Sequence, residues 1–332
     1  MTDPYPIVLE PILKAKVWGG RRLEAFGKTL PAGENIGESW EVADLDATSA
    51  SGGGGGSAHS VIVNGPLAGK TIRDAMSVWG PAMLGDAAAG AAGGFPVLVK
   101  YLDAREHLSV QVHPSPEYAR THPDAHLKTE SWVVLEAEPG SVIYKGLKTG
   151  TTREDLRAAI EGGTVASVLV EVPAVVGECH TLPSGTVHAL GAGVLVAEVQ
   201  TPSDTTYRVY DWVAEYGRPE RELHVEQAMA SSLFEDPPAA VAGEGARTIV
   251  SETEFYRIEL VRANCEAVAL GSDGSGPVVV MAARTMGCGI VGEGFEEVPL
   301  MAGQTAVVPA ACAHRTTLRA GPMTLAVVAT VL

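Results

Sequence analysis

A series of short apolar runs, rich in Val and flanked by Gly, Pro or Asp, limits the possible folds more than any other feature of this chain. The clearest runs are residues 60–63, 96–102, 132–135, 194–199, 277–281 and 323–331. Runs of this length, separated by turn residues, are typical of a sandwich or barrel of short antiparallel strands. With 332 residues, the chain suits two domains or one large one.

Helical periodicity is confined to residues 71–83, 151–160 and 224–234, so we expect a few peripheral helices beside a mainly β core. The second stretch opens with the capping candidates Thr151 and Thr152, continues with acidic residues and stops at two glycines.

Residues 236–246 combine Pro, Gly, Ala and acidic residues without any periodicity. We therefore predict a linker there. It would join a domain of residues 1–235, which includes small helical segments, to a C-terminal domain of residues 247–332.

A weak internal repeat suggests that the two domains are related. The spacing G-x5-P-x-G-x2-H runs from Gly177 to His188 and again from Gly303 to His314, with Ala311 in place of the second Gly. Two related β-barrels would explain the repeat, each with a tight turn that delivers a His into its lumen. The second half has no Gln-x-His or Glu cluster upstream of its turn, so we expect a metal site only in the first domain.

Two pairs of polar residues in the first domain have the spacing of one strand face. Gln111 and His113 are two residues apart, which places both on the same side of a strand. Lys128 and Glu130 have the same spacing directly before the run 132–135. Polar residues that face solvent would explain the first pair equally well, whereas Glu130 and Lys128 could face the same lumen.

Together with His188, these residues form a candidate metal site. Gln111, His113, Glu130 and His188 offer the mixed nitrogen and oxygen donors that Zn²⁺ accepts. If one coordination position stayed open, the ion would be catalytic rather than structural.

Further charged residues alternate with apolar ones closer to the linker. Glu198 and Gln200 lie in the run around 194–199 and would share one strand face. Arg208 has apolar neighbours on both sides, so its guanidinium needs either a carboxylate partner or an anionic ligand.

The amino-acid composition limits which molecules the protein is expected to bind. The formal net charge is −16, from 24 basic and 40 acidic side chains, and an acidic surface repels nucleic acid. A few basic side chains in a pocket can locally reverse this negative field, so a small phosphorylated substrate could still bind. The four cysteines form no C-x-x-C motif, and we find neither a signal peptide nor an apolar stretch long enough for a membrane span. We expect a cytoplasmic protein without a membrane or nucleic-acid partner.

Five sequence blocks, in order, resemble the signature blocks of type I mannose-6-phosphate isomerases (phosphomannose isomerases) of the cupin superfamily, in their short bacterial form. The blocks are FPVLVKYLDA, LSVQVHP, KTESWVVLEAEPG, LPSGTVHALG and VQTPSDTTYRVYDW. The resemblance covers residues 6–224, about two thirds of the chain, and is looser in the C-terminal third. It implies two cupin-like (jelly-roll) β-barrels with a few peripheral helices, the first of them catalytic.

The resemblance also implies roles for individual residues. The metal ligands of the family, for one Zn²⁺ per chain, fall on Gln111, His113, Glu130 and His188. Its active-site cations fall on Lys128 and Arg208, and a carboxylate of proton transfer falls on Glu198. Many relatives have His where this chain has Leu127.

The implied reaction interconverts mannose 6-phosphate and fructose 6-phosphate through an enediolate, in a monomer or homodimer. Glu198 is the first candidate for the general base and Lys128 the second. Two alternatives stay open. One is an iron-dependent cupin oxygenase that uses His113, Glu130 and His188 as a facial triad. The other is a sugar-phosphate-binding cupin without catalysis.

Overall fold

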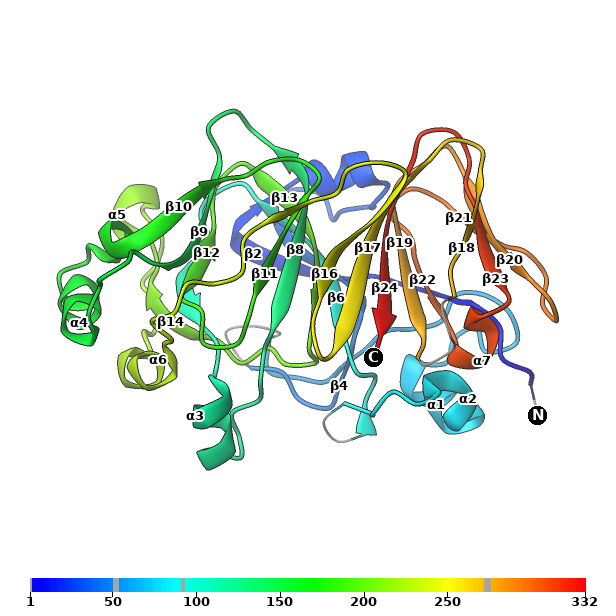
Figure 1. The fold of residues 1–332 in the computed structure, drawn as a ribbon, viewed down its shortest axis with the longest axis horizontal. Coiled ribbons are helices and arrows are strands. Elements are labelled where there is room, and N and C mark those ends of the chain that lie inside the picture. Colours follow the sequence, from blue (N-terminus) through cyan, green and yellow to red (C-terminus); the bar gives the residue numbers. More distant parts are fainter. Residues whose placement is uncertain (1, 50–53, 91–92, 272–275) are drawn as a thin grey trace.

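The computed structural model describes residues 2–49, 54–90, 93–271 and 276–332, and in these residues it is mainly β. The strands form four large antiparallel sheets that stack face to face along the long axis of the molecule (Figure 1). A fifth, two-stranded sheet consists of β4 (Asp44–Leu45) and β5 (Ala58–His59). The arrangement confirms the predicted fold class.

The first two layers are a five-stranded and a seven-stranded sheet. The order in the five-stranded sheet is β10 (Leu169–Pro173), β9 (Val142–Leu147), β12 (His188–Leu190), β7 (Val110–Val112) and β14 (Tyr207–Tyr210). The order in the seven-stranded sheet is β15 (Val241–Ala242), β11 (Glu178–Leu182), β8 (Glu130–Ala137), β13 (Val194–Gln200), β6 (Leu98–Ala104), β2 (Ile12–Gly20) and β3 (Ile36–Val42).

The last two layers are a six-stranded and a four-stranded sheet. The order in the six-stranded sheet is β1 (Ile7–Leu9), β22 (Thr305–Val308), β19 (Val278–Arg284), β24 (Thr324–Val331), β17 (Tyr256–Ala263) and β16 (Arg247–Glu252). The order in the four-stranded sheet is β18 (Ala267–Ala269), β23 (Thr316–Arg319), β20 (Cys288–Gly292) and β21 (Val298–Leu300).

Short helices lie around the stacked sheets (Figure 1). The α-helices are α1 (Ile72–Trp79), α2 (Pro81–Leu84), α3 (Pro116–Thr121), α4 (Arg153–Glu161), α5 (Val213–Tyr216), α6 (Val225–Ser231) and α7 (Ala310–Ala313). The 3-10 helices are η1 (Arg22–Phe26) and η3 (Val165–Val168). In the described residues no helix is long and apolar enough to span a membrane.

The alternation of side chains along each strand builds separate cores between the layers. On β8, Trp132 and Val134 pack toward the five-stranded sheet, whereas Val133 packs toward the six-stranded sheet. On β7, Val110 and Val112 pack against α4 and α6, as expected if Gln111 faces the opposite way. The first two sheets therefore enclose a space that polar side chains can enter from both walls.

Most predicted elements are present, with one exception. The runs from residue 96 onward correspond to β6, β8, β13, β19 and β24, and the helical stretches to α1–α2, α4 and α6. The run 60–63 is not a strand: it forms only isolated bridges, Leu9 to Ile62 and Val61 to Thr71. One neighbour, Leu9, is the last residue of β1, and the other, Thr71, caps the start of α1, so each neighbour ends before a longer ladder can form.

Two short strands pair with segments that are distant in the sequence. β1, at the N-terminus, pairs with β22, and β15, inside the predicted linker, pairs with β11. The proposed domain boundaries stay a prediction.

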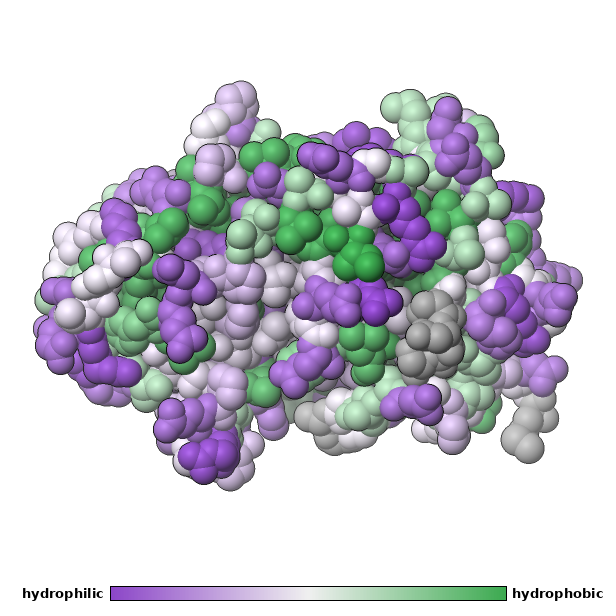
Figure 2. All heavy atoms as spheres, in the orientation of Figure 1, coloured by the Kyte–Doolittle hydropathy of each residue, from purple (hydrophilic) through white to green (hydrophobic). Residues whose placement is uncertain are grey.

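Hydrophilic and hydrophobic residues are interspersed over the face of the molecule that Figure 2 shows.

Candidate functional site

The predicted site residues come from two sheets that face each other. In the five-stranded sheet, Gln111 on β7 pairs with His188 on β12 and with Arg208 on β14, so their positions form one row. In the seven-stranded sheet, Glu130 begins β8 and pairs with Gln200 on β13. The two rows lie across the enclosed space, which brings together residues that are far apart in the sequence.

His113, Glu130 and His188 form a compact buried group whose donor atoms lie within 4.8 Å of one another. Nε2 of His188 is 3.1 Å from Oε1 of Glu130, and Nε2 of His113 is 3.3 Å from Oε2. Each of the three side chains is at most 1% exposed. Two imidazoles and a carboxylate are a donor set that suits zinc and similar cations.

Backbone carbonyls orient both imidazoles. Nδ1 of His113 donates to the carbonyl oxygen of Thr205 (3.1 Å), and Nδ1 of His188 donates to that of Thr186 (2.8 Å). We assign the tautomers from these contacts, because a neutral imidazole whose Nδ1 is protonated carries its lone pair on Nε2. Both Nε2 lone pairs therefore point at Glu130, which is the usual arrangement behind a metal-binding histidine.

Lys128 lies inside the same group. Its Nζ is 2.8 Å from Oε2 of Glu130 and 3.1 Å from Nε2 of His113. Burial and then Lys128 lower the pKa of His113 to about 3, so this imidazole is neutral near pH 7. Burial alone would raise the pKa of Glu130, but Lys128 and His113 outweigh it and hold that pKa well below its ordinary value.

The group fits a divalent cation. Neither carboxylate oxygen of Glu130 accepts a hydrogen bond of good geometry within the described ranges, despite the nearby cation. His113 is neutral and Glu130 is ionised, and these are the protonation states that metal binding needs. The amide nitrogen of Gln111 lies 3.3 Å from Nε2 of His188, so its oxygen would face the group after an amide flip.

Glu198 lies on the same wall as Glu130 and belongs to a buried network. Its Oε1 is 2.9 Å from Nζ of Lys100, and its Oε2 accepts a hydrogen bond from the indole of Trp132 (3.0 Å). Lys100 also donates to Oε1 of Gln200 (2.6 Å). Burial acts to lower the pKa of Lys100, but Glu198 and Glu38 outweigh it and raise that pKa above its ordinary value.

Arg208 is buried on the opposite wall. Its Nη1 donates to the carbonyl oxygen of Glu222 (2.9 Å), whereas its Nε has no hydrogen-bond partner among the described residues. Burial and then the neighbouring Arg221 lower the pKa of Arg208. Lys128, Glu198 and Arg208 thus line one cavity with Gln111, and the group of His113, Glu130 and His188 contacts the lining residues Lys128 and Gln111.

Comparisons with known proteins identify the family of this chain. Residues 7–132 match the catalytic domain of type I phosphomannose isomerase. The chain is 40% identical over 235 residues to the probable mannose-6-phosphate isomerase GmuF of Bacillus subtilis, covering 68% of this chain and 67% of that protein. It is 36% identical over 256 residues to the mannose-6-phosphate isomerase of Streptococcus mutans, covering 74% of each. The chain belongs to the type I phosphomannose isomerase family.

The structural comparison extends the match over the whole chain. The crystal structure of mannose 6-phosphate isomerase from Bacillus subtilis has a TM-score of 0.77 and 27% identity, covering 98% of this chain and 99% of that one. A putative mannosephosphate isomerase from Archaeoglobus fulgidus shares the fold, with a TM-score of 0.73 and 20% identity. The resemblance predicted from the five sequence blocks is confirmed.

Several residues of the cavity in this family member were not expected from the sequence. Glu38 binds Lys16 (3.1 Å) and accepts a hydrogen bond from the indole of Trp40 (2.6 Å). Both Trp40 and Lys100 line the cavity, as does Arg221 from the loop after α5. Lys100 interrupts the apolar run 96–102. A charged residue within a run that is expected to be buried was the one sign in the sequence that could have pointed to this part of the cavity.

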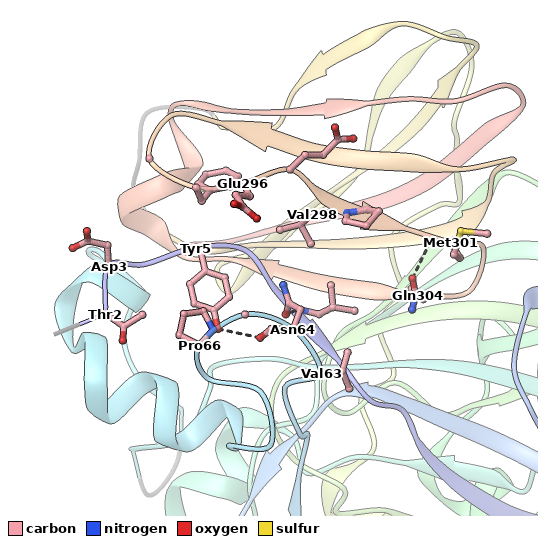
Figure 3. A pocket seen from close by; sticks show the side chains of 16 residues that line it. Thr2, Asp3, Tyr5, Val63, Asn64, Pro66, Glu296, Val298, Met301 and Gln304 are labelled. Carbon is pink, nitrogen blue, oxygen red and sulfur yellow. Dashed lines mark hydrogen bonds between the residues drawn. The ribbon is translucent and has the colours of Figure 1, made fainter.

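A larger cavity lies elsewhere, between the N-terminal segment and β21 of the four-stranded sheet. Tyr5, Val63, Asn64 and Val298 are among the side chains around it (Figure 3). Its lining includes carboxylates but no basic side chain, and none of the predicted site residues. An anionic substrate therefore fits the cavity between the first two sheets better.

Proposed function

We propose that this chain is a metal-dependent isomerase that interconverts mannose 6-phosphate and fructose 6-phosphate. The observation that carries the proposal is the convergence of both Nε2 lone pairs on the buried carboxylate of Glu130, which contacts Lys128 in the wall of a cavity with several cations. Relatives that carry this activity in their names support it.

The proposed metal ligands are His113, Glu130, His188 and, after an amide flip, Gln111. Zn²⁺ is the proposed ion because two imidazoles, a carboxylate and an open position make up a typical catalytic zinc site. When bound, the ion would act as a Lewis acid toward the sugar oxygens.

The reaction moves a proton between C1 and C2 of the sugar, which requires a base close to the reacting carbons. Glu198 is the proposed base, since a carboxylate can accept a proton and Lys100 with Trp132 fixes its orientation. An ammonium group such as that of Lys128 cannot accept one. Lys128 is instead suited to stabilise the negative charge of the enediolate.

Arg208 is the second cation that is available to the substrate. It has no carboxylate within 4 Å among the described ion pairs, so its charge is not neutralised locally. In the proposed reaction this guanidinium binds an anionic part of the sugar phosphate.

The two alternatives lack comparable support. A facial triad of His113, Glu130 and His188 would equally serve an iron oxygenase. An oxygenase has no evident need for Lys100, Lys128 and Arg208 around its substrate. A binding protein without catalysis needs no buried base.

Three further features belong to the proposal. Residues 1–235 would form the catalytic cupin domain, and residues 247–332 a cupin-like domain without a metal site. The acidic chain would have no nucleic-acid partner and would act in the cytoplasm. It would be a monomer or a homodimer.

A test measures isomerase activity on mannose 6-phosphate with the purified chain, after chelation and after zinc, manganese, cobalt or iron is restored. Loss on chelation and recovery with a divalent ion would support the proposal. His188→Ala should be inactive, whereas His122→Ala, which alters an exposed histidine, should keep full activity. A folded protein that is inactive with every metal would refute it, and iron-dependent oxygen uptake would favour the oxygenase.

A further inference from the structure

The larger cavity, between the N-terminal segment and β21, takes no part in the proposed reaction (Figure 3). Its volume of about 770 Å³ lies within the range that is typical of sites for small organic molecules. We propose that this cavity is a second binding site, and that its ligand is a small amphiphilic amine, an ammonium group on an apolar body. The inference goes beyond the proposed function and does not depend on it, because the two cavities share no lining residue.

One wall of the cavity is apolar and held in place. Tyr5, which is 7% exposed, lines the cavity, and its hydroxyl accepts a hydrogen bond from the backbone nitrogen of Leu67 (2.9 Å). The same hydroxyl donates to the carbonyl oxygen of Asn64 (3.1 Å), and the ring packs edge-on against Trp79. These contacts fix the ring, so a ligand meets a preformed aromatic surface.

Apolar side chains continue to the mouth of the cavity, where water reaches them. Val63 is 49% exposed and Met301 is 61% exposed, and they come from the loops after Ile62 and after β21. Phe295, in the loop before β21, adds a second aromatic ring to the lining. Exposed apolar side chains that gather around a hollow are typical of a binding site. An apolar ligand body would remove them from water.

The amide side chains in the lining are already hydrogen bonded. Oδ1 of Asn64 accepts a hydrogen bond from the backbone nitrogen of Val8 (2.7 Å), and its Nδ2 donates to the carbonyl oxygen of Pro6 (3.0 Å). Oε1 of Gln304 accepts one from the backbone nitrogen of Met301 (2.9 Å). The lining therefore offers few groups that could recognise a sugar hydroxyl, and recognition depends on apolar contact and on charge.

Two carboxylates determine the sign of that charge. Asp3 and Glu296 line the cavity, and neither has a hydrogen-bond or ion-pair partner among the residues that the structure describes. A third carboxylate, that of Glu297, pairs with Arg319. The described lining contains no Lys, Arg or His, so the local field favours a cation. Aromatic rings in the same lining also attract an ammonium group.

Calorimetry with three molecules of one shape and different charge tests the proposal. They are the cation phenethylammonium, the neutral phenethyl alcohol and the anion phenylacetate. The cation should bind one to one, and about twofold to fivefold more tightly than the alcohol, the effect of one exposed charge contact. Neither phenylacetate nor mannose 6-phosphate should displace it. An alcohol that binds as tightly as the cation, or displacement by either anion, would overturn the proposal.

Glu296→Gln tests the charge contact. The variant should lose about twofold to fivefold in affinity for phenethylammonium and keep its affinity for phenethyl alcohol. Glu293→Gln is the matched control, because Glu293 is exposed in the same loop but lies outside the lining. Thermal unfolding checks that both variants are folded. Equal losses of affinity for the cation and the alcohol in Glu296→Gln would contradict a role for its charge.

Val63→Arg tests the location. An Arg at this exposed position would fill part of the mouth and repel a cation, so the affinity for phenethylammonium should fall by more than about tenfold. Val175→Arg adds the same charge at a similarly exposed valine outside both cavities, and it should bind like wild type. Binding to Val63→Arg at wild-type affinity would place the amine elsewhere.

A final experiment separates a small amine from a protein partner. If phenethylammonium does not bind but a short peptide of Phe and Lys does, the occupant is a basic segment of another protein and the proposal is wrong. Isomerase activity is measured in parallel for each variant. Because the readout is binding, the result stands whether or not the chain proves to be an active isomerase.

Discussion

Nε2 of His188 lies 3.1 Å from Oε1 of Glu130, although the two residues belong to strands of different sheets. The contact joins β12 of the five-stranded sheet to β8 of the seven-stranded sheet, across the enclosed space. A cation held by both residues would therefore connect the two layers as well as serve the chemistry.

This connection predicts that metal binding stabilises the fold. Zn²⁺ at about 1,000 times its dissociation constant should add roughly 4 kcal/mol to the free energy of unfolding, because it binds the folded state alone. Glu130→Gln keeps the shape of the side chain but removes its charge, so it should abolish most of this gain. Thermal unfolding with and without zinc measures it. An equal gain in Glu130→Gln would place the metal elsewhere.

Replacement of Glu198 by Gln should separate chemistry from binding. The variant keeps an acceptor for the indole of Trp132 but cannot take a proton, so kcat should fall by about a hundredfold to ten-thousandfold. KM and zinc content should stay close to wild type. Steady-state kinetics and metal analysis provide the readouts, with Glu10→Gln, an exposed residue, as the control. Activity within a few fold of wild type would move the role of base to another residue.

Glu38 predicts a specific loss of stability in acid. Burial acts to raise its pKa, but Lys16 and Lys100 outweigh burial and lower it to about 2, against an ordinary value of 4.5. Between those values the unfolded chain binds a proton that the folded chain does not. The contribution of Glu38 is therefore complete above pH 4.5 and decreases as the pH falls toward 2.

Urea unfolding at pH 7 and pH 3 tests this effect with Glu38→Gln. The variant should lose roughly 2 kcal/mol less than wild type between the two pH values, since one pKa unit corresponds to about 1.4 kcal/mol. Glu10→Gln should behave like wild type. Equal losses in wild type and Glu38→Gln would show that other carboxylates cause the acid sensitivity.

The first turn of α4 provides a test of local stability. The hydroxyl of Thr152 accepts a hydrogen bond from the backbone nitrogen of Asp155 (3.1 Å), and the carboxylate of Asp155 accepts one from the backbone nitrogen of Thr152 (2.9 Å). Thr152→Ala should cost about 1 kcal/mol. Thr151, one residue earlier, does not make this capping contact, so Thr151→Ala serves as the control. Indistinguishable unfolding curves for the two variants would contradict the assignment of the cap.

Local sequence patterns were sufficient for most strands and for the spacing of the site residues. The two-residue period of a strand predicted that the side chain of Gln111 faces away from those of Val110 and Val112. The structure shows this alternation. The wrong prediction, residues 60–63, was an apolar run too. A ladder depends on which segment lies beside it, and the residues themselves do not specify that partner.

The network around the proposed base could not be predicted for the same reason. Glu198 is opposite Lys100 on one neighbouring strand and opposite Trp132 on the other, at separations of 98 and 66 residues (198 − 100 and 198 − 132). The register of β13 between β6 and β8 creates this cluster. Likewise, Arg221 in a Pro-containing loop becomes relevant only because that loop folds back onto β14, where the backbone of His224 donates to the carbonyl of Arg208.

The pairing of β1 with β22 has a consequence for synthesis on the ribosome. Ile7 lies opposite Val307, so β1 leaves the ribosome about 300 residues before its partner strand is made. Until then one edge of β1 has no neighbour from the six-stranded sheet, and that sheet is completed only after β24 has been made. A nascent chain arrested before β22 would therefore carry an apolar N-terminal segment, a natural place for a chaperone to bind.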